Sequence, residues 1–226
     1  MKISLRSLEY IFFLIASSEL SAHVLGYDAL HLVTKPLLVW MLALIFHLSV
    51  RDRYTSFHKA IFTGLGFSWL GDIFLLFQDK SEIYFILGLV SFLIAHVAYI
   101  YGFNQSVKGD GKPFFFWERP VLGFPFLALG VFVYITLYPN LGSLTIPVAL
   151  YTLVLLLMVL FSLNRQGRVV NDSFRLVFYG ALFFMLSDML LALNKFGDPF
   201  SHAGLAIMGT YIVAQYLIVK GSILQS

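Results

Sequence analysis

Apolar residues dominate this chain in long blocks that short polar segments separate. A helix needs about 20 mostly apolar residues to cross a hydrocarbon core of about 30 Å. The block from Pro120 to Asn164 has no charged residue and is divided by a turn at Tyr138–Gly142. The pattern predicts an all-α, polytopic membrane helix bundle of eight transmembrane helices: Ser7–Leu25, Thr34–Ser49, Lys59–Phe77, Ile83–Phe103, Pro120–Leu137, Leu144–Leu163, Arg175–Leu193 and His202–Lys220.

The polar connections are too short for a soluble domain, so we expect a single integral-membrane domain over residues 1–226. The first block has the basic start of a signal peptide, at Lys2 and Arg6. However, Glu9 and Glu19 interrupt it and no small-residue cleavage site follows. A retained first helix is therefore the preferred interpretation.

Composition narrows the class of protein further. Of 226 residues, 59% are hydrophobic, 12% are charged and none is cysteine. This excludes a soluble enzyme and a disordered chain. The lack of cysteine excludes a disulfide-stapled domain, a zinc finger and an iron–sulfur protein. The net charge of +3 does not indicate nucleic acid, because in a membrane protein the position of the charges carries the information.

The positive residues test the count of helices. With eight helices and both termini on one side, only Lys35, Lys80 and Lys195 fall on the other side. Positive residues mark the cytoplasmic face, so both termini are predicted to be cytoplasmic. Short loops and the absence of cysteine favour a bacterial inner membrane over the endoplasmic reticulum. The residues that share the side of the termini are Lys2, Arg6, Arg51, Arg53, Lys59, Lys108, Lys112, Arg119, Arg165, Arg168, Arg175 and Lys220.

Two segments of the chain resemble each other. Asp72 follows Gly71 near the end of the third helix, and Asp188 follows Ser187 near the end of the seventh, 116 residues later. A Gly-Leu pair, at Gly88 and again at Gly204, has the same spacing. These matches favour two parallel four-helix repeats, residues 1–110 and 111–226. The alternative is coincidence in a chain built from few residue types.

Polar residues at bilayer depth are candidates for function, because a charge there costs at least about 2.5–3.5 kcal/mol. Each has a structural alternative: an aspartate can pair with Lys35, His96 can be a hydrogen-bonded core residue, and Lys35 can extend to the interface. The candidates are Glu19, Lys35, Asp72, His96 and Asp188, with Tyr99, Asn194, Tyr211 and Gln215 as weaker additions.

Depth groups these residues. At 1.5 Å per residue, Glu19, Asp72 and Asp188 lie roughly 8–11 Å inside the non-cytoplasmic ends of their helices, and Lys35 lies at such an end. His96 is deeper, and whether it reaches the aspartates depends on where its helix begins. No chemistry is assigned to the remaining histidines, which are expected at interfaces or in loops: His23, His31, His47, His58 and His202.

An ordered set of motifs resembles the lysoplasmalogenase-like, or YhhN-type, membrane family. Thr34–Leu38 is similar to its TKPL signature, and Gly71-Asp72 ends a helix as in the family. Gly88–Tyr99 fits the pattern G-L-x-x-F-x-x-x-H-x-x-Y. Ser187-Asp188 and Tyr211–Gln215 continue the match over nearly the whole chain.

The resemblance implies an integral-membrane hydrolase without a cofactor. Characterised members cleave the vinyl-ether bond of lysoplasmalogens, which are alkenyl lysophospholipids, to a fatty aldehyde and a glycerophospho-alcohol. Such a protein acts on a lysophospholipid in the bilayer and has no nucleic-acid partner. The resemblance fixes the fold more firmly than the substrate.

Vinyl ethers are stable to base but open in acid, so this chemistry needs one protonated acid and one carboxylate that accepts a proton from water. Glycosidases meet a similar need with two carboxyl groups. Our hypothesis is that Asp72 and Asp188 form this pair, with His96 orienting water or the leaving oxygen. Substrate-binding roles fall to Lys35, which is placed to meet the phosphate, to Glu19, which could assist or hold Lys35, and to Tyr99, Asn194, Tyr211 and Gln215.

Three alternatives stay open. A metal held by Asp72, His96 and Asp188 is conceivable, but only one histidine lies at depth, so no metal is predicted. A proton-coupled transporter or lipid-translocating protein would use the same buried carboxylates. In a non-catalytic membrane protein, the aspartates would only hold helices together. No G-x-S-x-G motif supports a catalytic serine.

Overall fold

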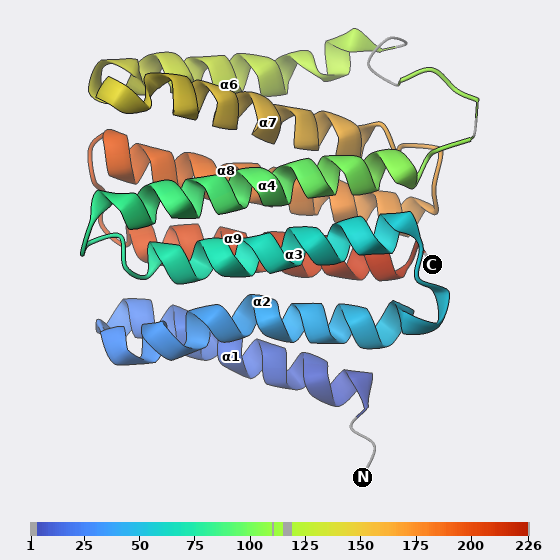
Figure 1. Cartoon of the computed structure of the whole chain (residues 1–226), viewed down its shortest axis with the longest axis horizontal. Coiled ribbons are helices and arrows are strands. Elements are labelled where there is room, and N and C mark those ends of the chain that lie inside the picture. The colour runs from blue at the N-terminus through green and yellow to red at the C-terminus, as the bar shows by residue number, and fades with distance from the viewer. Residues whose placement is uncertain (1–3, 110, 115–118, 226) are drawn as a thin grey trace. The chain divides into compact units, whose positions relative to one another are not determined.

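The structure, a computed structural model, describes residues 4–109, 111–114 and 119–225. Lys2, which the sequence placed on the cytoplasmic side, therefore lies outside the described residues. Within these ranges the fold is all-α (Figure 1). Its eight α-helices are α1 (Leu5–Leu25), α2 (Asp28–Val50), α3 (Ser56–Leu75), α4 (Glu82–Gln105), α6 (Phe124–Leu137), α7 (Thr145–Leu163), α8 (Asn171–Phe196) and α9 (Ala203–Ile223).

Length and apolarity make the chain an integral membrane protein. Seven helices of the described chain are long and apolar enough to span a membrane. The helix that does not meet this criterion is α3, which has 20 residues but includes three glycines and polar side chains such as Lys59 and Asp72. The structure thus supports eight helices with seven candidate spans, where the sequence predicted eight.

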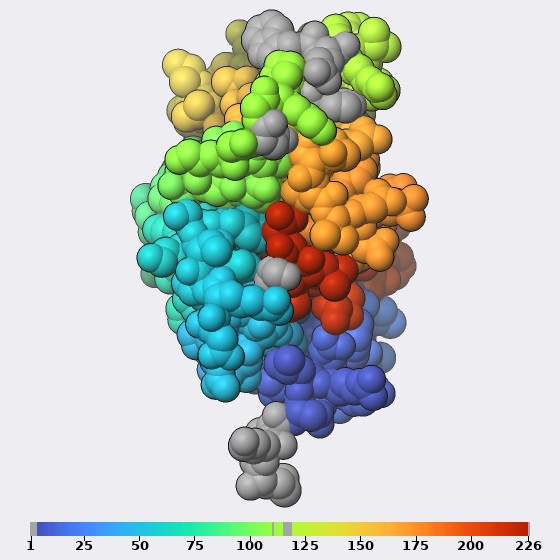
Figure 2. Space-filling model, turned by 90° about the vertical axis from the view of Figure 1, so that its right-hand side faces the viewer, coloured from blue at the N-terminus to red at the C-terminus, as the bar shows by residue number. Residues whose placement is uncertain are grey.

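Two compact units make up the chain, one up to Gly102 and one from Phe103 to Gln225. The first unit contains α1 to α4, which run lengthwise with alternating direction (Figure 1). The second unit contains α6 to α9. Figure 2 looks onto the end that carries the α2–α3 connection, in cyan, where Arg51, Asp52 and Arg53 are exposed.

A two-residue turn joins α1 to α2. Gly26 has the left-handed conformation (φ 68°), which glycine adopts without strain, and the Tyr27 amide donates to the Ala22 carbonyl at 3.0 Å. As a result α2 begins at Asp28, six residues before the predicted start at Thr34. The prediction was wrong because the apolar block on which it rested starts after the polar residues Asp28 and His31, and both of these belong to the helix.

Glycines set the register between α3 and α4. A Cβ atom on Gly64 would lie 2.5 Å from the Tyr99 ring, and one on Gly71 would lie 2.7 Å from the Phe92 ring. From Gly64 to Gly71 the chain advances seven residues along α3, and the facing residues on α4 run back by seven, from Tyr99 to Phe92. The two helices pack antiparallel, and the absence of side chains at the glycines lets the aromatic rings of α4 lie against α3.

In the second unit, α8 and α9 pack in the same manner. A Cβ atom on Gly180 would lie 2.8 Å from Ile218 Cγ1 and 2.9 Å from the Ile218 amide nitrogen, and one on Gly221 would lie 2.8 Å from Val177. Here the opposing atoms include backbone, so the two helices approach each other closely. Residues of α6, α7 and α8 complete this unit's core, with Leu137 and Val148 buried beside Leu193.

Candidate functional site

A buried carboxylate joins α1 to α2. Glu19 has no exposed surface, and its Oε1 atom lies 2.7 Å from His31 Nδ1 and 3.3 Å from His23 Nε2. The Thr34 hydroxyl donates to Glu19 Oε2 at 2.5 Å. The turn at Gly26 brings these residues together, because it folds the start of α2, with His31 and Thr34, back against the end of α1, with Glu19 and His23. Glu19 therefore does not face the lipid headgroups.

Lys35 lies deeper than its sequence position indicated. Because α2 begins at Asp28, Lys35 is about 10 Å inside the helix, and only 7% of its surface is exposed. The larger electrostatic interaction of its amino group is with the Asp72 carboxyl group, and the smaller one is with Glu19. The sequence placed Lys35 at the start of its helix, whereas it lies seven residues inside α2 and interacts with the carboxyl groups of Asp72 and Glu19.

The side chains of the Gly88–Tyr99 motif that the sequence analysis singled out are buried on α4. Phe92, His96 and Tyr99 are at most 5% exposed. The register set by the glycines brings the Gly71–Asp72 turn of α3 level with Phe92. His96 follows one turn later, so its axial distance from Asp72 is about 7 Å. The first unit thus places Glu19, Lys35 and Asp72 in one polar region and His96 about one turn deeper along α4.

Asp188 has a different partner, in the second unit. The Tyr151 hydroxyl on α7 donates to Asp188 Oδ2 at 2.7 Å, and both residues are half-buried. The neighbouring Ser187 hydroxyl donates to the Ile207 carbonyl on α9 at 3.0 Å. The sequence analysis did not assign Tyr151 a role. One signal was present, because Tyr151 precedes Asp188 by 37 residues, as Lys35 precedes Asp72.

Three of the weaker candidates, Asn194, Tyr211 and Gln215, lie in the second unit. Tyr211 and Gln215 are buried on α9, where the Gln215 amide donates to the Tyr211 hydroxyl at 3.2 Å, and Tyr211 also contacts the Phe184 ring. Asn194 is half-buried near the end of α8. Tyr211 and Gln215 therefore form a hydrogen-bonded pair, while Asn194 stays a prediction from sequence.

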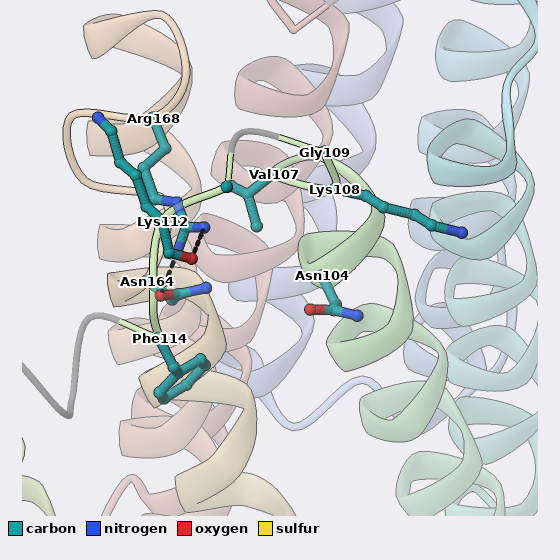
Figure 3. A pocket seen from close by; sticks show the side chains of 9 residues that line it. Asn104, Val107, Lys108, Gly109, Lys112, Phe114, Asn164 and Arg168 are labelled. Atoms are coloured by element: carbon teal, nitrogen blue, oxygen red, sulfur yellow. Dashed lines mark hydrogen bonds between the residues drawn. The ribbon is translucent and has the colours of Figure 1, made fainter.

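A charged hollow lies at the loops of the second unit. Figure 3 shows Arg168 donating to Asn164 Oδ1 at 2.8 Å and to the Lys112 carbonyl at 3.0 Å. Beside it Arg165 is fully buried and donates to the Ser106 and Ser173 hydroxyls. Burial lowers the pKa of Arg165 to about 9. These hydrogen bonds tie the α7–α8 loop to neighbouring segments.

Comparisons with known proteins agree with the motifs. The sequence model of the YhhN family matches residues 30–222. Human lysoplasmalogenase TMEM86A is 34% identical over 72% of this chain and 65% of its own length. Human lysoplasmalogenase TMEM86B is 32% identical over 62% of this chain and 54% of its own length, and a Dictyostelium discoideum lysoplasmalogenase homolog is 26% identical over 67% and 55%.

The match to the two TMEM86 proteins of human covers less than two thirds of their length. No solved structure matches the chain significantly.

Proposed function

The chain belongs to the YhhN family, and we propose that it is a membrane-embedded hydrolase of the vinyl-ether bond of lysoplasmalogens. The observation that carries the proposal is the buried polar region of Glu19, Lys35 and Asp72, which lies within the family match except for Glu19. A charge at this depth is costly, so the family's hydrolytic activity gives these residues a reason to be there. Relatives named lysoplasmalogenase support the substrate class.

Proton transfer at carbon defines the proposed reaction. An acid protonates the alkenyl carbon remote from the ether oxygen, and the adjacent carbon becomes part of an oxocarbenium ion. Water adds there and loses a proton to a carboxylate. The hemiacetal then breaks its bond to the glycerol oxygen, which takes the hemiacetal proton, and the products are a fatty aldehyde and the glycerophospho-alcohol.

The partners of the two aspartates suggest which takes which role. Lys35 offsets the cost of a buried charge on Asp72, so we assign Asp72 as the base that accepts the proton from water. Asp188 is hydrogen-bonded to the neutral phenol of Tyr151, and we assign it as the acid. His96 and Tyr99 are proposed to orient water or the leaving oxygen. Cooperation of Asp72 with Asp188 stays a prediction.

We further propose that all eight helices cross the membrane, with both termini cytoplasmic. Short connections join α3 to α2 and α4, which are candidate spans, and at 20 residues α3 has the length to cross about 30 Å. The packing of Phe92 and Tyr99 over its glycines covers the less apolar helix. The excess of positive residues on the side of the termini supports this orientation. Short loops and the absence of cysteine support a bacterial inner membrane.

Alkenyl, acyl and alkyl lysophospholipids, incubated with protein purified in detergent, provide the test. We expect aldehyde from the alkenyl lipid alone. In deuterated water, the aldehyde should carry one deuterium on the carbon next to the carbonyl, because that carbon receives the proton. In water labelled with oxygen-18, the glycerophospho-alcohol should stay unlabelled, because glycerol keeps its own oxygen when the bond from that oxygen to the former alkenyl carbon breaks.

Sealed vesicles separate hydrolysis from transport. Folded protein that gives no product from any of the three lipids would contradict the proposal. If unchanged lysophospholipid instead crosses the vesicle membrane in the presence of the protein, the buried carboxylates serve translocation. The Asp188→Asn variant is the matched control for both assays.

A further inference from the structure

Three potential metal ligands converge where α1 meets α2. The carboxylate oxygen of Glu19, Nε2 of His23 and Nδ1 of His31 all lie within 4.8 Å of one another. Glu19 and His23 are four residues apart on α1, which places them on one helical face. His31 approaches from the first turns of α2, which the two-residue turn brings back against α1.

The surroundings of Glu19 leave one of its oxygens for such an ion. Thr34 donates to Oε2, whereas both histidine nitrogens lie near Oε1. This is the pattern of a metal ligand whose second oxygen is held by an outer hydrogen bond. Lys35 interacts more strongly with Asp72 than with Glu19. The negative charge of Glu19 is therefore less engaged by Lys35 than that of Asp72 is.

Access from solvent differs between the three residues. The Glu19 side chain is completely buried, but those of His23 and His31 are 21% and 24% exposed. An ion can therefore approach from the histidine side, although the His23 Nε2 atom itself is buried. Two imidazoles, one carboxylate and one open position form a ligand set that suits Zn²⁺ and neighbouring divalent transition metals.

We infer that Glu19, His23 and His31 form a binding site for a divalent metal ion of the Zn²⁺ class. The ion replaces the hydrogen bond between Glu19 and His31 and the contact between Glu19 and His23, and it joins α1 to α2 through three side chains. Zn–N and Zn–O bonds of about 2.0–2.2 Å require ligand atoms close to the observed separations. The site shares Glu19 with the buried polar region described above, but it includes neither Asp72 nor Asp188, the two residues to which the proposed function assigns proton transfer.

Metal analysis of the purified protein tests this inference. The protein carries an affinity tag without histidine, is stripped with a chelator, reloaded with Zn²⁺ and measured by inductively coupled plasma mass spectrometry. We expect a single bound ion per chain, with nitrogen and oxygen ligands at about 2.0–2.1 Å in X-ray absorption spectra. Addition of Zn²⁺ should also raise the temperature of thermal unfolding.

Variants locate the ion. His23→Gln and His31→Gln keep polar side chains and should each abolish stoichiometric binding, while Thr34→Val should weaken the affinity about 10- to 100-fold. His47→Gln, at an exposed position of α2, is the control and should bind as the unchanged protein does. Equal binding by the unchanged protein and the His23→Gln/His31→Gln double variant would overturn the inference.

The outcome is separable from that of the proposed function. Metal content is measured without lipid, and Asp188→Asn should retain the ion although its turnover is lost. A protein that binds Zn²⁺ but releases no aldehyde would leave the site in place and remove the hydrolase proposal. A protein that releases aldehyde but binds no Zn²⁺ would do the reverse.

Discussion

The α3–α4 pair of the first unit and the α8–α9 pair of the second unit pack in the same way. Each is an antiparallel pair joined by a short connection, with close approach at a glycine, Gly64 in one and Gly180 in the other. Each has an aspartate after a small residue near the end of its first helix. Gly64 and Gly180 are 116 residues apart, as are Asp72 and Asp188.

What differs is the partner of the aspartate. Lys35 of α2 interacts with Asp72, and Tyr151 of α7 donates to Asp188. These partners are also 116 residues apart, so the same spacing supplies an ammonium group in one unit and a phenol in the other. This supports the proposed repeat and suggests that the two units kept one geometry while their chemistry diverged.

Loss of turnover is the largest expected effect. Asp72→Asn and Asp188→Asn should each lower the rate of aldehyde release about 10²- to 10⁴-fold, because each removes one proton-transfer group. Aldehyde release under saturating alkenyl lysophospholipid measures it, with size-exclusion chromatography to confirm folding. A nearly full rate in either folded variant removes that aspartate from the mechanism.

Stability should distinguish the two aspartates. Asp72→Asn leaves the buried Lys35 without its main counter-charge and should destabilise the protein by about 3 kcal/mol, whereas Asp188→Asn should have a much smaller effect. Thermal unfolding in detergent measures the difference. Adding Lys35→Met to Asp72→Asn should restore stability but not turnover; equal unfolding temperatures for the two single variants would contradict the assigned partners.

Close packing at the glycines can be compared by adding one methyl group. Gly64→Ala meets the Tyr99 ring, whereas Gly180→Ala meets backbone atoms of α9, which yield less easily. We expect both to destabilise, by about 1–3 kcal/mol, with Gly180→Ala the worse. Gly66→Ala and Gly209→Ala, where no atom lies within 4 Å, are the matched controls and should not destabilise.

The smallest effect is expected from a single hydroxyl. Tyr151→Phe removes the hydrogen bond to Asp188 and should reduce stability by about 0.5–1.5 kcal/mol. It should also change the rate of aldehyde release, because the hydroxyl contacts the proposed acid. Chemical unfolding of Tyr151→Phe beside Tyr179→Phe, an exposed position of α8, provides the measurement. Identical rates and stabilities would show that the phenol has no role.

The sequence predicted the helices because their signal is local: a block of apolar residues is long enough to span a membrane or it is not. It placed Asp72 and Asp188 at depth for the same reason. It misplaced the start of α2 because the apolar block starts after Asp28 and His31, although the helix resumes directly after the turn at Gly26-Tyr27. It also missed Tyr151 and the pairing of His31 with Glu19, since these depend on which faces of two helices meet.

The turn at Gly26-Tyr27 has a consequence for biogenesis. With two residues between them, α1 and α2 form a helical hairpin, and we expect the two helices to enter the bilayer together. Glu19, Thr34 and Lys35 then leave water in one step, with opposite charges already near each other. The cost of about 2.5–3.5 kcal/mol for each isolated charge is reduced before α3 delivers Asp72. A longer turn would expose each charge to lipid alone during synthesis.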